Sequence, residues 1–351
     1  MNIRWMIYGA YGFTGTLIAE AAVRRGHRPI LAGRSAGKLA PLAERLGLEA
    51  VAVDLNDPVA LAREVGKVEL VYHAAGPFVE TSTQMVDACL VAGTHYLDIT
   101  GELGVLRRNL GRDREARERG IVVITGAGFD VIPTDCLAAS LAMRLPDALE
   151  LEIDIDALTT PTAGTIVSSI APLLEGGLVR RNGELQPYRL GEGARRVRFS
   201  HGERLVLPLP IADLETAYHT TGIPNITTSM AVPSLAPGLL RVASPVIRGA
   251  LKSRSMRNIA GKLVHALVKG PSEKTQRSGR AHIHGRARNA MGKEVEEWLD
   301  VQEPYRFTSI AAIHAVEKVL REKPLGALTP ALALGAEFVM EIEGSERVVM
   351  K

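Results

Sequence analysis

The fold of this chain is decided by Met6-Ile7-Tyr8-Gly9-Ala10-Tyr11-Gly12-Phe13-Thr14-Gly15, an apolar run that leads into a glycine-rich turn. A helical pattern follows up to Gly26, and a second apolar run, Ile30-Leu31-Ala32, ends at Gly33. Strand, glycine turn, helix and strand in this order are typical of the first unit of a dinucleotide-binding fold. Glycines at this spacing let the backbone approach a pyrophosphate, which free N–H groups at the helix start can bind.

The end of the second apolar run indicates which dinucleotide is bound. A site that prefers NAD places Asp or Glu about 20 residues past the glycines, where the carboxylate binds the ribose 2′-OH. This chain instead has Gly33-Arg34-Ser35 there, with Lys38 one turn further on. A guanidinium and a hydroxyl suit a 2′-phosphate, so the sequence predicts NADP(H) rather than NAD(H). The alternative is that the glycines form only a tight turn and that Arg34 is a surface charge.

Further apolar runs recur at α/β spacing over residues 50–53, 70–73, 95–98 and 121–124. Short apolar runs of this kind are typical of buried parallel strands, whose ligands bind beyond their carboxyl ends. Residues 74–78, 100–102 and 126–130 are therefore expected to border the cofactor. The residues predicted to contact it are Gly9, Tyr11, Gly12, Phe13, Thr14, Gly15, Arg34, Ser35, Lys38, Asp54, Ala75, Gly76, Pro77, Phe78, Gly101 and Gly128.

The pattern changes after about residue 130. Residues 149–155 alternate apolar and acidic side chains, residues 196–209 are strand-like, and residues 281–301 form a predicted hairpin. We therefore predict an α/β protein with an N-terminal Rossmann domain of doubly wound parallel sheet (residues 1–130). A second α+β domain with a mixed or antiparallel sheet, for substrate binding and dimerisation, is expected over residues 131–307. A C-terminal helix over 308–335 is expected to pack back on the first domain.

Composition limits the setting in which the protein works. The chain has 351 residues, enough for about two domains, and only two cysteines, Cys89 and Cys136. Two cysteines form no disulfide framework, and Met1-Asn2-Ile3-Arg4 leads straight into the first predicted strand, which is expected to leave no room for a signal peptide. No apolar run reaches the ~18–20 residues that cross a bilayer. These features predict a cytoplasmic protein.

Several motifs resemble those of the saccharopine dehydrogenase-like superfamily, most closely its bacterial branch of trans-acting enoyl reductases and saccharopine dehydrogenase-like oxidoreductases. The motifs are GAYGFTG (9–15), LAGRS (31–35), AAGPF (74–78), AGTHYLDITGE (92–102), GFDVIPTD (128–135), GPSEKTQRSGRA (270–281) and LTPALALG (328–335). The resemblance implies an N-terminal Rossmann domain, a C-terminal domain whose sheet covers the cofactor, and hydride transfer between them. The saccharopine-processing relatives carry G-x-D-P-G where this chain has Gly128-Phe129-Asp130-Val131-Ile132, and this difference argues against an amino-acid substrate.

Hydride transfer requires little acid–base machinery beyond one proton donor. The predicted catalytic residues are Asp130, Tyr96 and Asp135, which lie at or after predicted strand ends. Asp130 is the first choice, because the glycines before it allow a ligand to approach; its alternative role, shared with Asp135, is to cap the next helix. Tyr218 and His219 fall in a polar segment interpreted as a loop of the substrate domain. A water molecule is the alternative proton donor.

Metal and nucleic-acid binding are not expected. His282 and His284 share one face of a strand without a third ligand, so no metal site is predicted. Residues 241–288 carry 12 Lys or Arg and one acidic residue, but no aromatic side chain to stack on bases. This basic block has three interpretations: an anion-binding surface for coenzyme A or an acyl carrier, a peripheral membrane contact, or a solvated charged face. A homodimer is compatible with the sequence.

These observations favour an NADP(H)-dependent oxidoreductase that reduces an enoyl or carbonyl group of a lipid or polyketide acyl substrate. Two alternatives stay open at this point. One is an amino-acid imine dehydrogenase of the saccharopine type. The other is a protein that binds NADP(H) as a sensor or scaffold without turnover.

Overall fold

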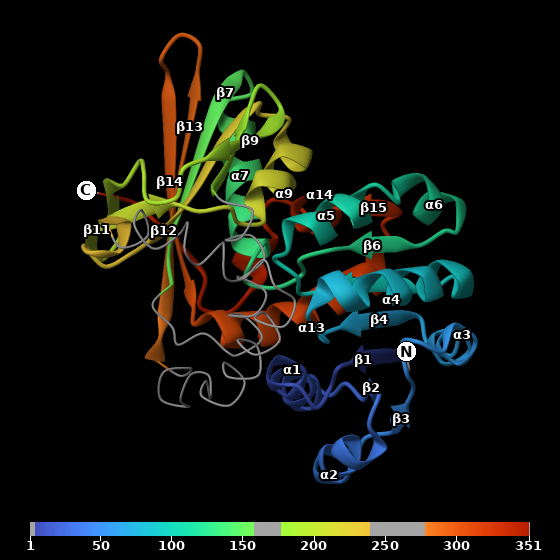
Figure 1. The fold of residues 1–351 in the computed structure, drawn as a ribbon. Helices are drawn as coiled ribbons and strands as arrows, with labels where there is room; N and C mark the ends of the chain where they lie inside the picture. The colour runs from blue at the N-terminus through green and yellow to red at the C-terminus, as the bar shows by residue number, and fades with distance from the viewer. Residues whose placement is uncertain (1–3, 158–176, 239–277, 351) are drawn as a thin grey trace. The chain divides into compact units, whose positions relative to one another are not determined.

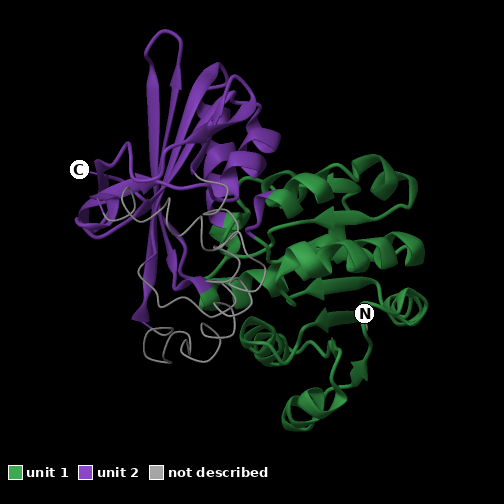
Figure 2. Cartoon of the chain, in the orientation of Figure 1, with its two compact units in different colours: residues 1–100, 104–132, 305–343 green, residues 101–103, 133–304, 344–351 purple. Residues whose placement is uncertain are grey.

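The structure is a computed structural model that describes residues 4–157, 177–238 and 278–350. The chain separates into two compact units (Figure 2). The first contains residues 1–100, 104–132 and 305–343, and the second contains residues 101–103, 133–304 and 344–351. The chain therefore enters the second unit near residue 133 and returns to the first near residue 305.

The first unit is built on a parallel sheet of seven strands, in the order β15-β6-β5-β4-β1-β2-β3 (Figure 1). Its elements are β1 (Trp5–Tyr8), α1 (Phe13–Arg24), β2 (Ile30–Gly33), α2 (Ala36–Leu46), β3 (Ala50–Ala52), α3 (Pro58–Val65), β4 (Leu70–His73), α4 (Phe78–Ala92), β5 (His95–Asp98), α5 (Leu103–Leu110), α6 (Asp113–Glu118), β6 (Val122–Ile124), α13 (Pro304–Glu322), β15 (Gly326–Leu328), α14 (Pro330–Leu334) and the 3-10 helix η1 (Phe338–Glu341).

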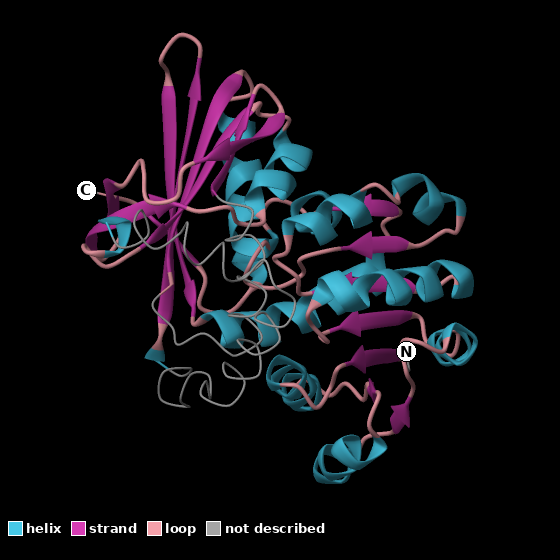
Figure 3. Cartoon of the chain, in the orientation of Figure 1, coloured by secondary structure: helices cyan, strands magenta, loops and turns pink. Residues whose placement is uncertain are grey.

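The strands of this sheet are short, and all but the exposed edge strand β3 are largely buried because their side chains are mostly apolar on both faces. β1, β2 and β4 are buried at every residue. Met6 and Val71 on one face pack with Leu61 of α3 and Met85 of α4 in a single apolar cluster. Figure 3 shows helices on both faces of the sheet, as expected for the predicted doubly wound fold, which is confirmed.

The last strand of the sheet comes from the end of the chain. The sequence predicts one helix over 308–335, but α13 ends at Glu322, and Gly326–Leu328 form β15, which pairs in parallel with β6. The prediction of a continuous helix was therefore wrong. The helix stops at Glu322 because Lys323 has a φ of +50° and Pro324 follows it, and Gly326–Leu328 then form a short edge strand.

The second unit is built on a nine-stranded mixed sheet, in the order β10-β11-β12-β7-β13-β14-β16, with β8 paired to β12 and β9. Neighbouring strands run antiparallel except β12 and β7, which are parallel. The elements are α7 (Ile132–Arg144), β7 (Ala148–Asp156), β8 (Gly177–Arg181), β9 (Glu184–Tyr188), β10 (Arg195–Phe199), β11 (Gly202–Pro208), α9 (Asp213–Thr221), β12 (Asn225–Ala231), β13 (Arg280–Asn289), β14 (Glu294–Gln302) and β16 (Glu346–Val348).

Alternation along β7 gives this sheet one apolar and one polar face. A Cβ at Gly285 of β13 would collide with Leu137 and Leu141 of α7, so the helix packs directly on the apolar face. On the polar face, β13 pairs with β7 so that Arg286 lies opposite Glu152 and His284 opposite Asp154. The alternation that predicts a half-buried strand thus reflects a helix on one side and cross-strand ion pairs on the other.

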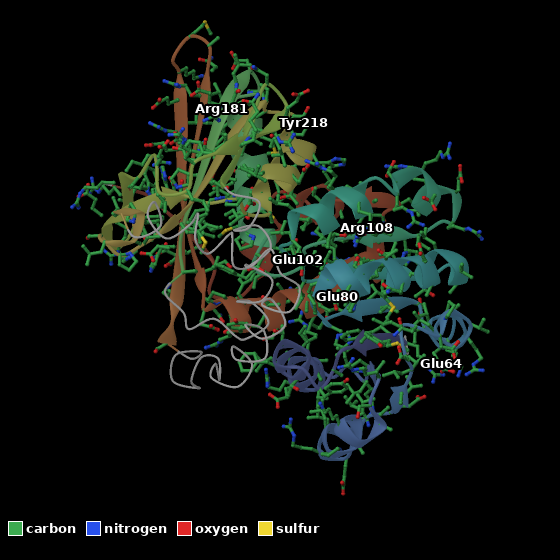
Figure 4. The ribbon with its side chains drawn as sticks, viewed as in Figure 1. Glu64, Glu80, Glu102, Arg108, Arg181 and Tyr218 are labelled. Carbon is green, nitrogen blue, oxygen red and sulfur yellow. The ribbon has the colours of Figure 1, made fainter. Side chains whose placement is uncertain are left out.

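Two further expectations concern the second unit. Tyr218 and His219, interpreted from sequence as loop residues, lie on α9. The centroid of the Tyr218 ring, labelled in Figure 4, lies 4.1 Å from the Arg180 guanidinium. The loop interpretation was wrong, because the segment ends at a glycine in the left-handed conformation, Gly222, that is typical of a helix terminus.

Most of the basic block lies outside the described residues. Within the described part of the chain, no helix is long and apolar enough to span a bilayer.

Candidate functional site

The glycine turn lies where the strand order of the first sheet reverses, between β1 and β4. Ligands of doubly wound sheets bind at this point, beyond the carboxyl ends of the strands. Gly9 has a φ of +86°, and a Cβ there would lie 2.8 Å from the backbone N of Ala75. A Cβ at Gly15 would collide with the carbonyl oxygen of Gly9. Both glycines are thus required for the turn to close against its neighbours.

The start of α1 is open to an anion. The N-cap residue Gly12 makes no side-chain capping bond, and the first turn has no acidic residue. The first N–H of the helix to bond its own backbone is that of Thr16, which donates to Gly12 O at 2.9 Å. The N–H groups of Phe13, Thr14 and Gly15 have no protein acceptor among the described residues. The glycine cradle and these donors fit the pyrophosphate of a dinucleotide.

The residues after β2 fit a 2′-phosphate. Arg34 is exposed and has no ion-pair or hydrogen-bond partner in the described part of the chain. Ser35 is the N-cap of α2, and its hydroxyl makes no capping bond, while the helix has no acidic residue in its first turn. The Lys38 Nζ lies 5.7 Å from the centroid of the Tyr11 ring. Tyr11 and Lys38 also line a shallow pocket of about 310 Å³ between α1 and α2.

We expect Arg34→Ala to weaken NADPH binding and to leave NADH binding nearly unchanged. Loss of a bidentate charged contact with the 2′-phosphate costs about 1.5–3 kcal/mol, and NADH lacks that phosphate. Calorimetric titration with both cofactors measures the difference. Arg114→Ala is the matched control, because Arg114 is an exposed arginine on α6 whose ion pair among the described residues is with Glu118. Equal losses for NADPH and NADH would contradict the assignment.

The other residues predicted to contact the cofactor also follow strands of this sheet. Asp54 comes after β3, Ala75–Phe78 after β4, Gly101 after β5 and Gly128 after β6. Because the strands are parallel, their carboxyl ends lie at one edge. The loop after β4 is fixed at Ala75, whose carbonyl accepts a bond of 2.7 Å from the Thr81 hydroxyl. Gly101 groups with the second unit, so its position relative to the other residues is not described.

A buried polar network connects the ends of β4, β5 and β6. The Tyr96 hydroxyl donates to Asp98 Oδ2 at 2.7 Å, so its oxygen accepts from His73 Nδ1 at 3.1 Å. Asp98 Oδ1 accepts the N–H groups of Thr100 (3.0 Å) and Gly126 (2.9 Å). Burial raises the pKa of Tyr96 well above its usual range and lowers the pKa of His73 to about 3. The network therefore ties three strand ends together, and the geometry favours a structural role for Tyr96 over the predicted proton donation.

Tyr96→Phe is expected to lower the free energy of unfolding by about 1–3 kcal/mol, because it removes the buried hydrogen bonds of the Tyr96 hydroxyl with His73 Nδ1 and Asp98 Oδ2. Urea denaturation measures this loss, and the affinity for NADPH should change little. A stable variant with lost turnover would contradict the structural role and favour Tyr96 as the donor.

The two predicted catalytic aspartates lie in different surroundings. Asp130 follows β6, and its side chain retains solvent-accessible area, yet desolvation by the surrounding protein raises its pKa to about 6. Asp135 is fully buried on α7, and its Oδ1 accepts a bond of 2.6 Å from the Thr220 hydroxyl of α9. The structure thus gives Asp135 a role in joining two helices, whereas Asp130 has the exposure and acidity of a proton donor.

Three residues that no sequence pattern singled out contact the candidate site. Tyr305, Phe307 and Thr308 lie at the start of α13, and Thr308 accepts the Phe129 N–H at 3.0 Å. The contact spans 179 positions of the chain, so only the fold could reveal it.

The described residues contain no group of three or more His, Cys, Asp or Glu that could hold a metal ion. His282 and His284 instead pair with Asp300 (2.8 Å) and Asp154 (3.1 Å).

Comparison with known proteins agrees with this arrangement. Residues 5–124 match the family described as "Saccharopine dehydrogenase NADP binding domain". A trans-acting enoyl reductase of Mycobacterium tuberculosis is 34% identical over 147 residues, which are 40% of this chain and 35% of the relative. The trans-acting enoyl reductase of Mycobacterium ulcerans is 33% identical over 138 residues, which are 37% of this chain and 33% of the relative.

A solved structure shows the same fold over the whole chain. Apo saccharopine dehydrogenase (L-Glu forming) from Saccharomyces cerevisiae has a TM-score of 0.64 and 14% identity, and the match covers 99% of this chain and 100% of that one. Residues 5–124 belong to the saccharopine dehydrogenase NADP-binding domain family, and the chain is a distant homologue of the mycobacterial trans-acting enoyl reductases. The aligned part spans about a third of the length of these curated relatives, 35% and 33% in the two cases.

Proposed function

We propose that this protein is an NADP(H)-dependent oxidoreductase that reduces an enoyl or carbonyl group of a lipid or polyketide acyl substrate. One observation carries the cofactor assignment: the open glycine turn at the strand-order reversal is followed, at the end of β2, by Arg34 and Ser35 instead of a carboxylate. The printed description of the mycobacterial relatives, trans-acting enoyl reductases, supports the substrate class.

In the proposed reaction, NADPH supplies the hydride when it is bound. The chain itself holds and orients the cofactor: the N–H groups at the start of α1 bind the pyrophosphate, and the Arg34 guanidinium binds the 2′-phosphate. Asp130 donates the proton to the substrate atom that gains negative charge. A carboxyl group with a pKa of about 6 is suited to this step, because it is partly protonated near neutral pH and loses its proton readily.

The residues after Asp130 favour an acyl substrate over an amino-acid imine. In this chain Asp130 is followed by Val131 and Ile132, both fully buried, where the saccharopine-processing pattern has Pro-Gly. The side of the loop that follows Asp130 is thus apolar and packed into the protein. These two positions therefore offer no charge to the carboxylates of an amino-acid substrate.

Purified protein tests the proposal directly. NADPH oxidation is measured with trans-2-enoyl coenzyme A thioesters of several chain lengths and, in parallel, with a 2-oxo acid plus a primary amine. Turnover with the thioesters supports the proposal. Turnover with the imine-forming pair alone would replace the acyl substrate by an imine. Tight NADPH binding without turnover in either series would favour the sensor or scaffold.

The carrier of the acyl group is part of the proposal. The basic block suits the phosphates of coenzyme A or of a phosphopantetheine arm. Its residues 278–288 are described, and there Arg286 and Arg288 already pair with Glu152 and Glu150. An acyl carrier would therefore have to use the basic residues before 278.

A cytoplasmic location and a homodimer stay predictions from the sequence.

A further inference from the structure

The start of α13 contacts two separate loops of the first unit. The Tyr305 ring meets the Phe13 ring edge to face, with centroids 5.1 Å apart and an interplanar angle of 82°. The Thr308 hydroxyl accepts the N–H of Phe129 at 3.0 Å. Phe307 packs edge to face on Phe129, with centroids 6.2 Å apart. One turn of helix thus contacts both the loop after β1 and the loop after β6.

The α13 side of these contacts is tight and buried, while the Phe13 ring itself is 37% exposed. Tyr305, Phe307 and Thr308 are 9%, 0% and 6% exposed, respectively. A Cβ at Gly128 would lie 3.2 Å from Thr308 Cγ2, so the β6 loop rests directly on the threonine methyl group. Buried side chains in close-packed surroundings have few alternative rotamers, so a displacement at one end of the helical turn is transmitted to the other.

The two loops carry the two halves of the candidate site. Phe13 is the first residue of α1, whose N–H groups are the proposed donors to the cofactor phosphates. Phe129 directly precedes Asp130, the proposed proton donor. Binding of a phosphate at α1 fixes Phe13, and Phe13 is in edge-to-face contact with Tyr305. The helical turn from Tyr305 to Thr308 then connects the phosphate site to the peptide that holds Asp130.

We propose that Tyr305 and Thr308 are positioning residues that transmit occupation of the phosphate site at α1 to the loop that holds Asp130. The inference rests on the proposed function, because it assumes that α1 binds the cofactor phosphates. It adds a role for the end of the chain: α13 holds the β6 loop more firmly when the adenosine end of the cofactor is in place.

Hydrogen–deuterium exchange of the peptide 126–131 tests this inference without any turnover. The probe is 2′,5′-ADP, which carries the two phosphates of the adenosine end and has no nicotinamide to touch the β6 loop itself. In the unmodified protein, saturating 2′,5′-ADP is expected to slow exchange in this peptide about fivefold, the lower end of coupling between sites. Calorimetry confirms saturation for each variant.

The variants separate coupling from general stability. Tyr305→Leu removes the aromatic ring. Thr308→Val removes the acceptor of the Phe129 N–H and keeps the shape of the side chain. Both variants are expected to bind 2′,5′-ADP, but the ligand should no longer slow exchange in peptide 126–131. Tyr305→Phe and Thr308→Ser keep the ring and the oxygen, and are expected to restore it. Thr94→Val is the matched control, because it removes a buried threonine hydroxyl that bonds Val65 O and Val68 O elsewhere in the same unit. It is expected to behave like the unmodified protein.

Three results would overturn the inference. If 2′,5′-ADP slows exchange in Tyr305→Leu or Thr308→Val as much as in the unmodified protein, then α13 does not transmit occupation of the phosphate site to the β6 loop. Unchanged exchange in the unmodified protein with 2′,5′-ADP bound would remove the coupling and leave the cofactor assignment intact. Absence of 2′,5′-ADP binding to the unmodified protein would remove both the inference and the proposed function.

Discussion

Gly15→Ala is expected to lower the affinity for NADPH more than a hundredfold. The added Cβ would collide with the Gly9 carbonyl oxygen and would lie 2.9 Å from Ala10 Cα, and both are backbone atoms that cannot rotate away. The start of α1 must therefore shift away from the turn, and its N–H groups lose the pyrophosphate. A loss of about 3 kcal/mol corresponds to this change in Kd, within the combined cost of overpacking and of lost charge-assisted hydrogen bonds.

A second helical glycine provides the control. Gly104 of α5 has open space where a Cβ would be added. Gly104→Ala is therefore expected to leave NADPH binding unchanged and to stabilise the fold by about 0.5–1 kcal/mol, because alanine is the better helix former. Calorimetric titration and urea denaturation compare the two variants. NADPH binding by a folded Gly15→Ala protein with unmodified affinity would show that the turn does not hold the pyrophosphate.

Asp130→Asn is expected to lower kcat by about 10²–10⁴-fold while the Kd for NADPH stays nearly constant, because the amide keeps the shape of the side chain and cannot donate the proton. The rate of the unmodified enzyme should fall as pH rises through about 6, where Asp130 loses its proton. That limb of the pH profile should be absent from the variant. Asp147→Asn, which alters an exposed carboxylate in the turn before β7, should have the unmodified profile.

Stability against pH gives a second measurement on Asp130. Its pKa is raised from 3.8 to about 6, so between these values the folded state binds more protons than the unfolded state. The unmodified protein should therefore lose stability as pH rises from about 4 to 6, and Asp130→Asn should lack this loss. Thermal unfolding at pH 5 and pH 7.5 tests the difference in the two proteins. A variant that is less stable at pH 7.5 and still turns over would make Asp130 a helix cap.

The pattern of apolar runs and glycines along the sequence was enough to predict the fold of the first unit and the edge of its sheet at which a ligand is expected to bind. The six apolar runs before residue 125 all form strands, and five of them are largely buried, as is typical of mostly apolar strands in a parallel sheet; β3, at the edge of the sheet, is exposed. The glycines of the turn and the residues after β2 are adjacent in sequence, so their chemistry is visible without a structure. The hairpin of β13 and β14 was predicted for the same reason, because its register is set by a turn between neighbouring segments.

The roles of single polar residues depended on contacts that no local pattern contains. Tyr96 and Asp135 lie in predicted positions, but partners 23 and 85 residues away, His73 and Thr220, place them in buried hydrogen bonds. β15 has only three residues and is a strand because β6 offers an open edge. Likewise, Thr308 reaches the Asp130 loop only after the chain has built the second unit and returned. The sequence by itself determined where the backbone turns and where the strands form, because both depend on residues that are near neighbours in the chain. The tertiary structure alone decided which polar groups are paired and which are available to a ligand. The reason is that pairing joins residues that come together only when the chain folds.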